Sequence, residues 1–303
     1  MKKSLVTGGA GFIGSNLVDE LVKKKHKVIV IDNFDTGRLS NLSHHSKKDL
    51  KIIRIDICNK KNLDKYFKSN VVGTLNVVEA AKKAKIKKFI YAASASCYGI
   101  PDKFPIKENA KINTIYPYAF TKWQAEELIM HWVKIYNFPA ISIRFFNAYG
   151  PRSRTSGAYG AVFGVFLAQK LANKPLTIVG DGNQTRDFVH VLDLVHGIIK
   201  AALSKKVGKL YNIGSGKEVK VNKIAQLIGG KKIYIPKRPG EPNRSLANIS
   251  KIKKDLNWSP KIRIEEGVRN LLKNIHHWKD APVWTPKSIK KETKIWFKLL
   301  KVK

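Results

Sequence analysis

Cysteine is nearly absent from this sequence: its 303 residues include only Cys58 and Cys97. Two cysteines are too few for a disulfide framework or a structural zinc site, so we expect neither, and no metal site of any kind. A reducing cytoplasm is the compartment in which such a chain is expected. Long apolar runs are absent too, which excludes a transmembrane segment. Glycines interrupt the apolar start of the chain, which is not the pattern of a signal peptide.

Acidic residues are also scarce, since 22 Asp and Glu stand against 58 Lys and Arg, a formal net charge of +36. Such a charge is typical of nucleic-acid-binding proteins. The lysines, however, are spread along the chain in short clusters without a nucleic-acid motif, and arginine, the usual base-reading side chain, is much rarer. We therefore expect no nucleic-acid partner. A positive field would instead attract an anionic nucleotide substrate to its cleft.

The rest of the composition, with 43% apolar residues, is that of a globular protein with an ample core. In the first half, short apolar runs alternate with helical patterns. This alternation predicts an α/β fold with a doubly wound parallel sheet, covered by helices on both faces. We predict strands over 4–7, 27–31, 51–55, 88–92 and 140–145, and helices over 12–24, 61–68, 71–83 and 118–136.

Glycine- and proline-marked turns after Pro151 indicate a smaller α+β substrate domain. We assign residues 1–150 to a dinucleotide-binding domain to which 185–213 return, 151–184 and 214–285 to the substrate domain, and 286–303 to a basic C-terminal helix or tail. In that tail, apolar residues fall near one helical face: Ile289, Ile295, Trp296, Leu299 and Leu300. We expect this helix to dock on the protein, and weak contact with an anionic membrane surface is the alternative.

One irregularity lies between the helical patterns at 61–68 and 71–83, which run together with no strand between them. Neighbouring parallel strands need a crossover connection. Back-to-back helices therefore indicate that a strand is absent at this point.

A glycine-rich turn follows the first strand, with Gly8, Gly11 and Gly14 leading into a helix that contains Phe12 and Ile13. Without side chains, this backbone can approach a pyrophosphate, and the helix N-terminus offers N–H groups and a positive dipole end to the phosphates. Glycines also mark simple turns, so a dinucleotide site is predicted only if the next strands carry matching residues.

Acidic residues at the ends of the next two strands extend this pattern. Asp32, followed by Asn33, ends the second strand at the distance expected of an acid that binds the adenosine ribose. Because a carboxylate there repels a 2′-phosphate, NAD is favoured over NADP. Asp56 and Ile57 follow the third strand and are expected to meet the adenine, although Asp56 could also be a helix N-cap.

A candidate catalytic group lies near the start of the long helix at 118–136. Tyr118 and Lys122 are four residues apart and therefore share one helical face. The lysine ammonium would stabilise a phenolate and so lower the pKa of the tyrosine, which is too high for a base at neutral pH. Ser94, after the fourth strand, could hydrogen-bond the substrate oxygen. Tyr-x-x-x-Lys is common on amphipathic helices, and the dinucleotide motif and the serine make it informative here.

With these motifs in place, the chain resembles the extended short-chain dehydrogenase/reductase family. Within that family it is most similar to the NAD-dependent nucleotide-sugar epimerases and dehydratases, above all the UDP-glucose and UDP-N-acetylglucosamine 4-epimerases. The matching segments span most of the chain up to Pro260: 7–15, 72–77, 116–122, 144–152 and 180–188.

The resemblance implies a role for each matching residue. Tyr118 is expected to be the acid/base, Lys122 its partner and a ligand of the nicotinamide ribose, and Ser94 a hydroxyl that activates the sugar. Further members of the expected site contact the sugar nucleotide (Asn147) or its diphosphate (Arg186 and Arg238), for which arginine offers paired donors. Surface salt bridges are the alternative for both arginines. The family's dimers imply a homodimer through helices 71–83 and 118–136.

The resemblance also bears on the reaction. Relatives that eliminate water carry Thr-Asp-Glu where this chain has Ser94-Ala95-Ser96, and the decarboxylases keep a Glu at the third position. Since Ala95 and Ser96 cannot supply that acid/base pair, we expect 4-epimerisation of a UDP-hexose through a 4-keto intermediate, with NAD tightly held. Dehydration, decarboxylation and reduction of a nucleotide sugar remain alternatives, and the residue types do not specify the sugar.

Family members have roughly thirty residues, about one strand–helix unit, between the positions that match Phe67 and Asn70. In the family that strand lies beside the first one, in the middle of the sheet. In one hypothesis the strand at 88–92 fills the gap and the chain is an active epimerase. In the other, the gap displaces Ser94 and Tyr118 by about 5 Å, one strand spacing, and the chain is a non-catalytic or defective nucleotide-binding relative.

Overall fold

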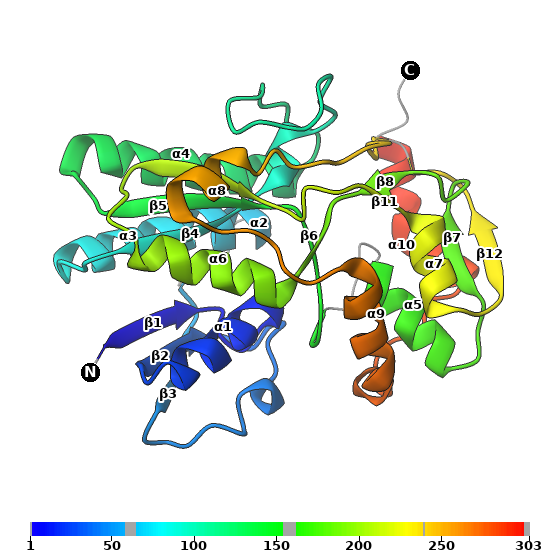
Figure 1. The fold of residues 1–303 in the computed structure, drawn as a ribbon, viewed down its shortest axis with the longest axis horizontal. Coiled ribbons are helices and arrows are strands. Elements are labelled where there is room, and N and C mark those ends of the chain that lie inside the picture. The colour runs from blue at the N-terminus through cyan, green and yellow to red at the C-terminus, as the bar shows by residue number, and fades with distance from the viewer. Residues whose placement is uncertain (1, 58–64, 154–161, 239, 300–303) are drawn as a thin grey trace.

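The computed structural model describes residues 2–57, 65–153, 162–238 and 240–299, which form two lobes (Figure 1). The larger lobe holds two parallel three-stranded sheets between layers of helices. The smaller lobe holds short two-stranded sheets and helices from the second half of the chain. The predicted α/β class, with parallel strands and helices on both faces, is confirmed.

The first sheet has the strand order β1-β2-β3, and β1 forms one of its edges. Alternating apolar residues explain its packing: Val28 and Val30 of β2 are buried with Val18 of the following helix, α1. The three strands and the helix closely match the predicted ranges: β1 (Lys3–Thr7), α1 (Phe12–Lys23), β2 (Lys27–Asp32) and β3 (Leu50–Arg54).

The second sheet has the order β10-β5-β4, and β4 forms one of its edges. Helices cover both faces. Tyr91 of β4 packs with Ile129 on one side, whereas Ile141 and Ile143 of β5 pack with Leu194 on the other. The elements are β4 (Phe89–Ser94), α4 (Pro117–Tyr136), β5 (Ala140–Phe145), α6 (Val191–Leu203) and β10 (Lys209–Ile213).

The helical segments between the third and fourth strands are continuous. α2 (Lys65–Phe67) leads through a π-helical turn (Lys68–Val72) directly into α3 (Gly73–Lys83). Asn70, in the π turn, donates from Nδ2 to Oγ1 of Thr121 on α4 at 3.0 Å. A π turn accommodates an extra residue in a helix. Within the described residues from 65 to 88 there is no strand, as the sequence predicted.

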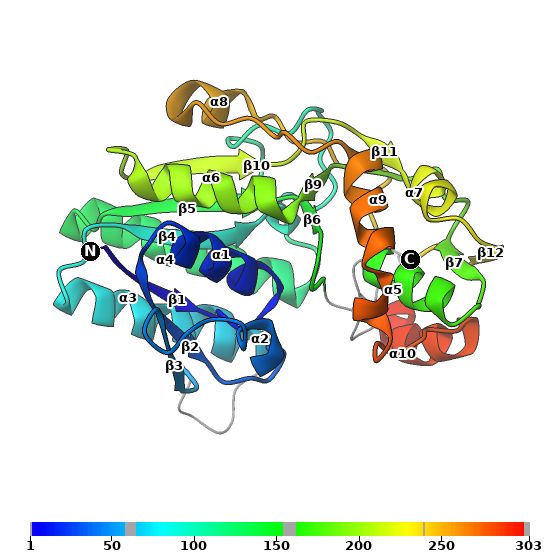
Figure 2. The same cartoon turned by 60° about the horizontal axis from the view of Figure 1, so that its bottom comes forward.

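The two half-sheets do not join. In the described part of the chain, β1 pairs only with β2, and β4 pairs only with β5. The hypothesis that the strand at 88–92 moves beside β1 is therefore wrong. The halves are held together by helices instead, since Phe12 and Leu17 of α1 pack against Val191 and Val195 of α6 (Figure 2).

The smaller lobe has its own apolar core, in which Phe163, Phe166 and Leu167 pack with Ile178 and Ile224. The short strands β6 and β9 run parallel to each other between the lobes. The remaining elements are β6 (Asn147–Tyr149), α5 (Val162–Leu171), β7 (Leu176–Val179), β8 (Thr185–Arg186), β9 (Phe188–His190), β11 (Val219–Lys220), α7 (Val221–Ile228), β12 (Lys232–Ile235), α8 (Ser250–Leu256), α9 (Ile264–Lys273) and α10 (Pro286–Leu299).

The C-terminal helix α10 is docked on this lobe at its start. Ile289 and Thr293 are buried, and Gln169 donates from Nε2 to the carbonyl oxygen of Trp284 at 2.7 Å. The docking prediction is confirmed for these residues. The side chains of Ile295, Trp296, Leu299 and Leu300 lie outside the described part. No helix among the described residues is long and apolar enough to span a membrane.

Candidate functional site

The glycine turn between β1 and α1 is closely packed. The amide of Gly8 donates to the carbonyl oxygen of Ile31 at 2.8 Å, and Gly8 has a φ of +66°, which favours glycine. A Cβ atom at Gly14 would lie 2.1 Å from the carbonyl oxygen of Gly8. Gly11 caps α1 without a side-chain hydrogen bond, and the first N–H groups of a helix, here including those of Phe12 and Ile13, have no acceptor within the helix itself. This geometry fits a pyrophosphate.

Asp32 lies against this turn at the carboxyl end of β2. It is buried, and its carboxylate accepts hydrogen bonds from the amides of Ala10 at 2.9 Å and Phe34 at 2.8 Å. Asn33 next to it accepts from the amide of Asp35 through Oδ1. The carboxylate is therefore fixed beside the glycine turn, where a ribose hydroxyl can donate to it.

Asp56 and Ile57 follow β3 at the same end of the first sheet. Asp56 is exposed, and the carbonyl oxygen of Ile57 accepts a hydrogen bond from Nδ2 of Asn76 on α3 at 2.7 Å. The start of the helix predicted over 61–68, which Asp56 could cap, lies outside the described part.

Ser94 and Tyr118 come together at the carboxyl end of β4, from strand and helix respectively. Burial raises the pKa of Tyr118, and a hydrogen bond with the Ser94 side chain opposes that rise. The ring of Tyr66 from α2 meets the ring of Tyr118 edge-on, with centroids 5.8 Å apart. The tyrosine is nevertheless 37% exposed, so a substrate can reach its hydroxyl.

Lys122 lies one helical turn further along α4. Its ammonium donates to the carbonyl oxygen of Ala92 and lies 4.5 Å from the ring centroid of Tyr91. Burial lowers the pKa of Lys122 to about 8, and the carboxylate of Glu126 opposes the shift. The structure thus brings Lys122 to the same strand end as Tyr118, but directs its charge at the backbone of β4.

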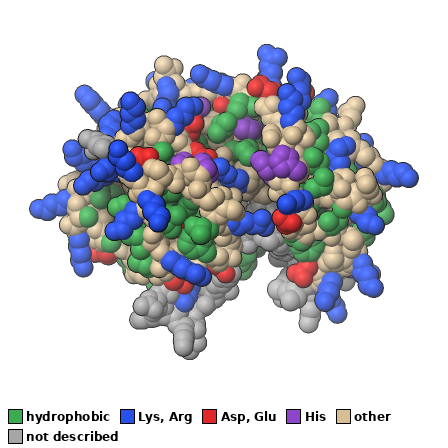
Figure 3. Space-filling view, turned by 90° about the horizontal axis from the view of Figure 1, so that it is seen from below, with side chains coloured by type: hydrophobic (Ala, Val, Ile, Leu, Met, Phe, Trp, Pro, Cys, Tyr) green, Lys and Arg blue, Asp and Glu red, His purple; other side chains and the backbone are tan. Residues whose placement is uncertain are grey.

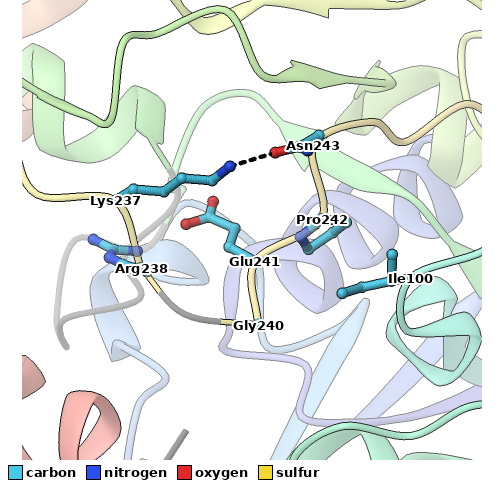
Figure 4. Close-up of a pocket in the computed structure, with 7 residues that line it drawn as sticks. All are labelled: Ile100, Lys237, Arg238, Gly240, Glu241, Pro242 and Asn243. Carbon is cyan, nitrogen blue, oxygen red and sulfur yellow. Dashed lines mark hydrogen bonds between the residues drawn. The ribbon is translucent and has the colours of Figure 1, made fainter. Parts of the chain in front are cut away.

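Two of the expected substrate residues, Arg186 and Arg238, lie near one another around Glu241. Arg186 is buried and forms an ion pair with Glu241 at 2.7 Å. Glu241 and Arg238 line a pocket of about 340 Å³ with Lys237 (Figure 4). Asn147, the third expected residue, is exposed at the start of β6.

Sequence patterns missed several residues of this region. Tyr66 contacts Tyr118, the half-buried Tyr116 hydrogen-bonds Ser96, and Glu241 forms an ion pair with Arg186. The family-like segment 116–122 already contained Tyr116, whereas no sequence signal pointed to Tyr66 or Glu241, because their contacts join segments far apart in the chain.

Two family models match the chain. The NAD dependent epimerase/dehydratase family matches residues 64–214, and the GDP-mannose 4,6 dehydratase model matches residues 5–70. A provisionally named UDP-glucose 4-epimerase of Methanocaldococcus jannaschii is 35% identical, and the match covers 88% of this chain and 96% of that protein.

This chain belongs to the NAD dependent epimerase/dehydratase family. It is therefore an NAD-dependent enzyme of the short-chain dehydrogenase/reductase type. UDP-glucuronic acid decarboxylase 1 of Arabidopsis thaliana is 34% identical, with 90% of this chain and 69% of that protein covered. Among solved structures, UDP-glucuronic acid 4-epimerase from Bacillus cereus, in complex with UDP-glucuronic acid and NAD, is 31% identical at a TM-score of 0.80, covering 90% of this chain and 98% of that one.

The family matches also bear on the segment that the sequence predicts to be missing. The two family models meet at residues 64–70, where α2 runs into α3. The match to the Methanocaldococcus protein extends over 298 positions, but 88% of the 303 residues of this chain is only about 267 residues. About 31 positions of the whole match therefore have no residue in this chain. This number agrees with the strand–helix unit expected from the sequence.

Proposed function

We propose that the chain catalyses the NAD-dependent 4-epimerisation of a UDP-hexose through a 4-keto intermediate. The supporting observation is the hydrogen-bonded Ser94–Tyr118 pair, followed in the chain by Ala95 and Ser96, which carry no carboxyl group. An elimination or a decarboxylation in this family needs a carboxyl group at those positions. Without such a carboxyl group, Ser94 and Tyr118 are suited to a reaction that oxidises and then reduces the same sugar carbon.

Each side chain then has a definite task. Tyr118 accepts the proton of the sugar 4-hydroxyl through its phenol oxygen, and Ser94 hydrogen-bonds the same hydroxyl. The charge of Lys122 favours the phenolate. NAD, held at the glycine turn, would supply the hydride acceptor and donor for C4, while Tyr118 and Ser94 hold the 4-oxygen.

Binding is assigned to the surrounding residues. The glycine turn, with Gly8, Gly11 and Gly14, holds the pyrophosphate of NAD together with the N–H groups of Phe12 and Ile13. Asp32 and Asn33 hold the adenosine ribose, and Asp56 and Ile57 the adenine. On the substrate side, Asn147 contacts the sugar nucleotide, while its diphosphate competes with Glu241 for Arg186 and binds Arg238. α3 and α4 are the proposed dimer surface.

The decisive test is an assay of the purified full chain with UDP-glucose, UDP-galactose and the corresponding N-acetylhexosamines and uronic acids, with bound NAD measured in parallel. We expect 4-epimer formation, and a loss of about 10²–10⁴-fold in kcat for Tyr118→Phe. Tyr136→Phe, at the exposed far end of the same helix, is the matched control and should leave kcat unchanged.

Turnover of none of these sugars, with NAD still bound, would overturn the proposed reaction but not the family assignment. It would favour the second candidate, a non-catalytic nucleotide-binding relative, which is supported by the failure of β4 to pair with β1 in the described part of the chain. Release of carbon dioxide from a UDP-uronic acid would favour the decarboxylase reaction instead, which the Arabidopsis relative's name suggests.

A further inference from the structure

The long loop between β2 and β3, drawn in blue in Figure 1, carries two adjacent histidines, His44 and His45. Packing of the loop brings them onto α1. Leu42 is buried in the same core cluster as Val18 of α1, and the amide of His45 donates to the carbonyl oxygen of Leu42 at 3.2 Å. Both imidazole rings therefore lie at Asp19, which follows Val18 on the helix.

The three side chains form a compact cluster. Oδ1 of Asp19 lies 2.9 Å from Nε2 of His44 and 2.7 Å from Nε2 of His45, and all three atoms lie within 4.8 Å of one another. The His45 side chain is 9% exposed and that of His44 is 49% exposed, so the cluster is held on one side and open to solvent on the other. No other three His, Cys, Asp or Glu side chains come together in this way in the described part of the chain.

Arg152 fixes the orientation of the carboxylate. It lies in the segment after β6 and forms an ion pair with the other oxygen of Asp19, Oδ2, at 2.8 Å. A carboxylate that binds a metal is usually held by such a second partner. The pair keeps Oδ1 directed at the two rings, although the guanidinium charge also lowers the affinity of the cluster for a cation.

We propose that Asp19, His44 and His45 bind one divalent transition-metal ion, such as Zn²⁺, through Oδ1 and the two Nε2 atoms. The ion takes the place of the hydrogen atoms between the rings and the carboxylate, and each neutral ring keeps its proton on Nδ1. With bonds of about 2.0–2.1 Å, two ligand atoms of a tetrahedral zinc ion lie about 3.3 Å apart. The cluster therefore has to open by only about 0.5 Å to bind the ion.

The ligand types decide the class of metal. Imidazole nitrogen favours zinc, copper and nickel, whereas magnesium and calcium prefer a shell of oxygen ligands. The small number of cysteines, from which the sequence predicted no metal site, does not bear on a site of histidine and aspartate. Three protein ligands leave a fourth position for water, so we expect weaker binding than at a four-ligand structural site.

The test is a calorimetric titration of the metal-free full chain with ZnCl₂ and, separately, with MgCl₂. We expect one Zn²⁺ per chain with a Kd in the micromolar range, and no binding of Mg²⁺ at the same concentrations. His45→Gln keeps a side-chain hydrogen-bond donor for Asp19 but removes the imidazole, so it should weaken zinc binding at least about tenfold. His44→Gln, at the more exposed ring, should do the same without disturbing the fold.

The matched control is the double variant His276→Gln/His277→Gln. These residues are the other adjacent histidines of the chain, with ring centroids 4.5 Å apart, and they should not contribute to the site. Saturating zinc should also raise the Tm of the wild type and of this control by about 5 °C, because the ion ties the loop to α1. His44→Gln should lose that shift.

Zinc binding only at millimolar concentrations, or an unchanged affinity in both His44→Gln and His45→Gln, would overturn the proposal. Loss of binding in the His276→Gln/His277→Gln variant alone would assign the ion to that pair, against the proposal. Equal affinities for Zn²⁺ and Mg²⁺ would overturn the class of metal. None of these measurements depends on turnover of a sugar nucleotide.

Discussion

At the scale of single residues, the proposed chemistry depends on the charge of Lys122. Its ammonium is surrounded by the carbonyl oxygen of Ala92, the ring of Tyr91 and, one turn away, the carboxylate of Glu126. Glu126 itself is buried and paired with Arg144. Burial therefore outweighs these favourable contacts and lowers the pKa of the lysine to about 8.

This pKa predicts how stability changes with pH. In the unfolded chain Lys122 keeps its ordinary pKa of 10.5, so between about pH 8 and that value the unfolded state binds more protons. The contribution of Lys122 to stability therefore rises with pH across this window, and its cost is fully present below pH 8. The Tm of the wild type relative to Lys122→Met should rise through this window. Lys134→Met, an exposed lysine on the same helix, is the control and should show no such trend.

If the difference in Tm between the wild type and Lys122→Met did not change with pH, that result would contradict a buried ammonium at Lys122. Tm values in urea-free buffers of constant ionic strength give the comparison without any need for catalytic turnover.

Much of the site at this scale follows from the sequence. The i,i+4 spacing of Tyr118 and Lys122 and the position of Ser94 after a strand are local patterns, and the structure places all three residues at one strand end. The bond from Lys122 to Ala92 and the pair of Arg186 with Glu241 were not predicted. The first contact depends on which backbone carbonyl group has no partner in the sheet, and the second on which loops meet in the folded chain. The local spacing of residues in the sequence contains no information about either.

At the scale of elements, the turn from β1 to α1 is the part of the fold with least freedom. The strand, the turn and the helix were predicted within a residue of their observed ends, because Gly8, Gly11 and Gly14 and the apolar period of the helix specify them locally. The packing around Gly14 is much tighter than the packing around Gly11. A Cβ atom at Gly14 would lie 2.1 Å from a backbone oxygen, whereas one at Gly11 would lie 3.3 Å from the same oxygen.

This difference predicts graded effects of two matched substitutions. Gly14→Ala forces the backbone apart and should lower the free energy of unfolding by about 1–3 kcal/mol, as overpacking does, and weaken NAD binding at least tenfold. Gly11→Ala, at a φ of −79°, should have a much smaller effect on both. Chemical denaturation and NAD titration of the three proteins measure this order. Equal losses for both variants would show that the close approach of Gly14 to Gly8 is not what shapes the cradle.

The sheet shows where prediction from sequence ends. The run-together helices indicated a missing strand, because a crossover was absent from the pattern. Whether β4 would move beside β1 was left open, since it depends on how α1, α4 and α6 pack. The structure keeps β4 on β5, where Tyr91 and Ala93 are buried under α4, and leaves both edges open. Moving the strand would give up that packing.

At the scale of the whole molecule, the net charge of +36 is the most unusual property. Figure 3 shows Lys and Arg side chains distributed around the visible face, without one dominant patch. Such a distribution creates a general positive field around the molecule, not a surface shaped for a nucleic-acid duplex. Both proposed ligands, NAD and a UDP-sugar, carry a negative diphosphate, so the field acts in their favour.

The field therefore predicts a strong salt dependence of nucleotide association. The screening length falls from about 30 Å at 0.01 M salt to about 10 Å at 0.1 M. Over that range the association rate constant of UDP, measured by stopped flow, should fall by about tenfold. Uridine has the same base and ribose without the diphosphate, so its rate should stay nearly constant. Equal salt dependence for UDP and uridine would contradict long-range attraction, and would leave the local ion pairs at Arg186 and Arg238 as the source of anion binding.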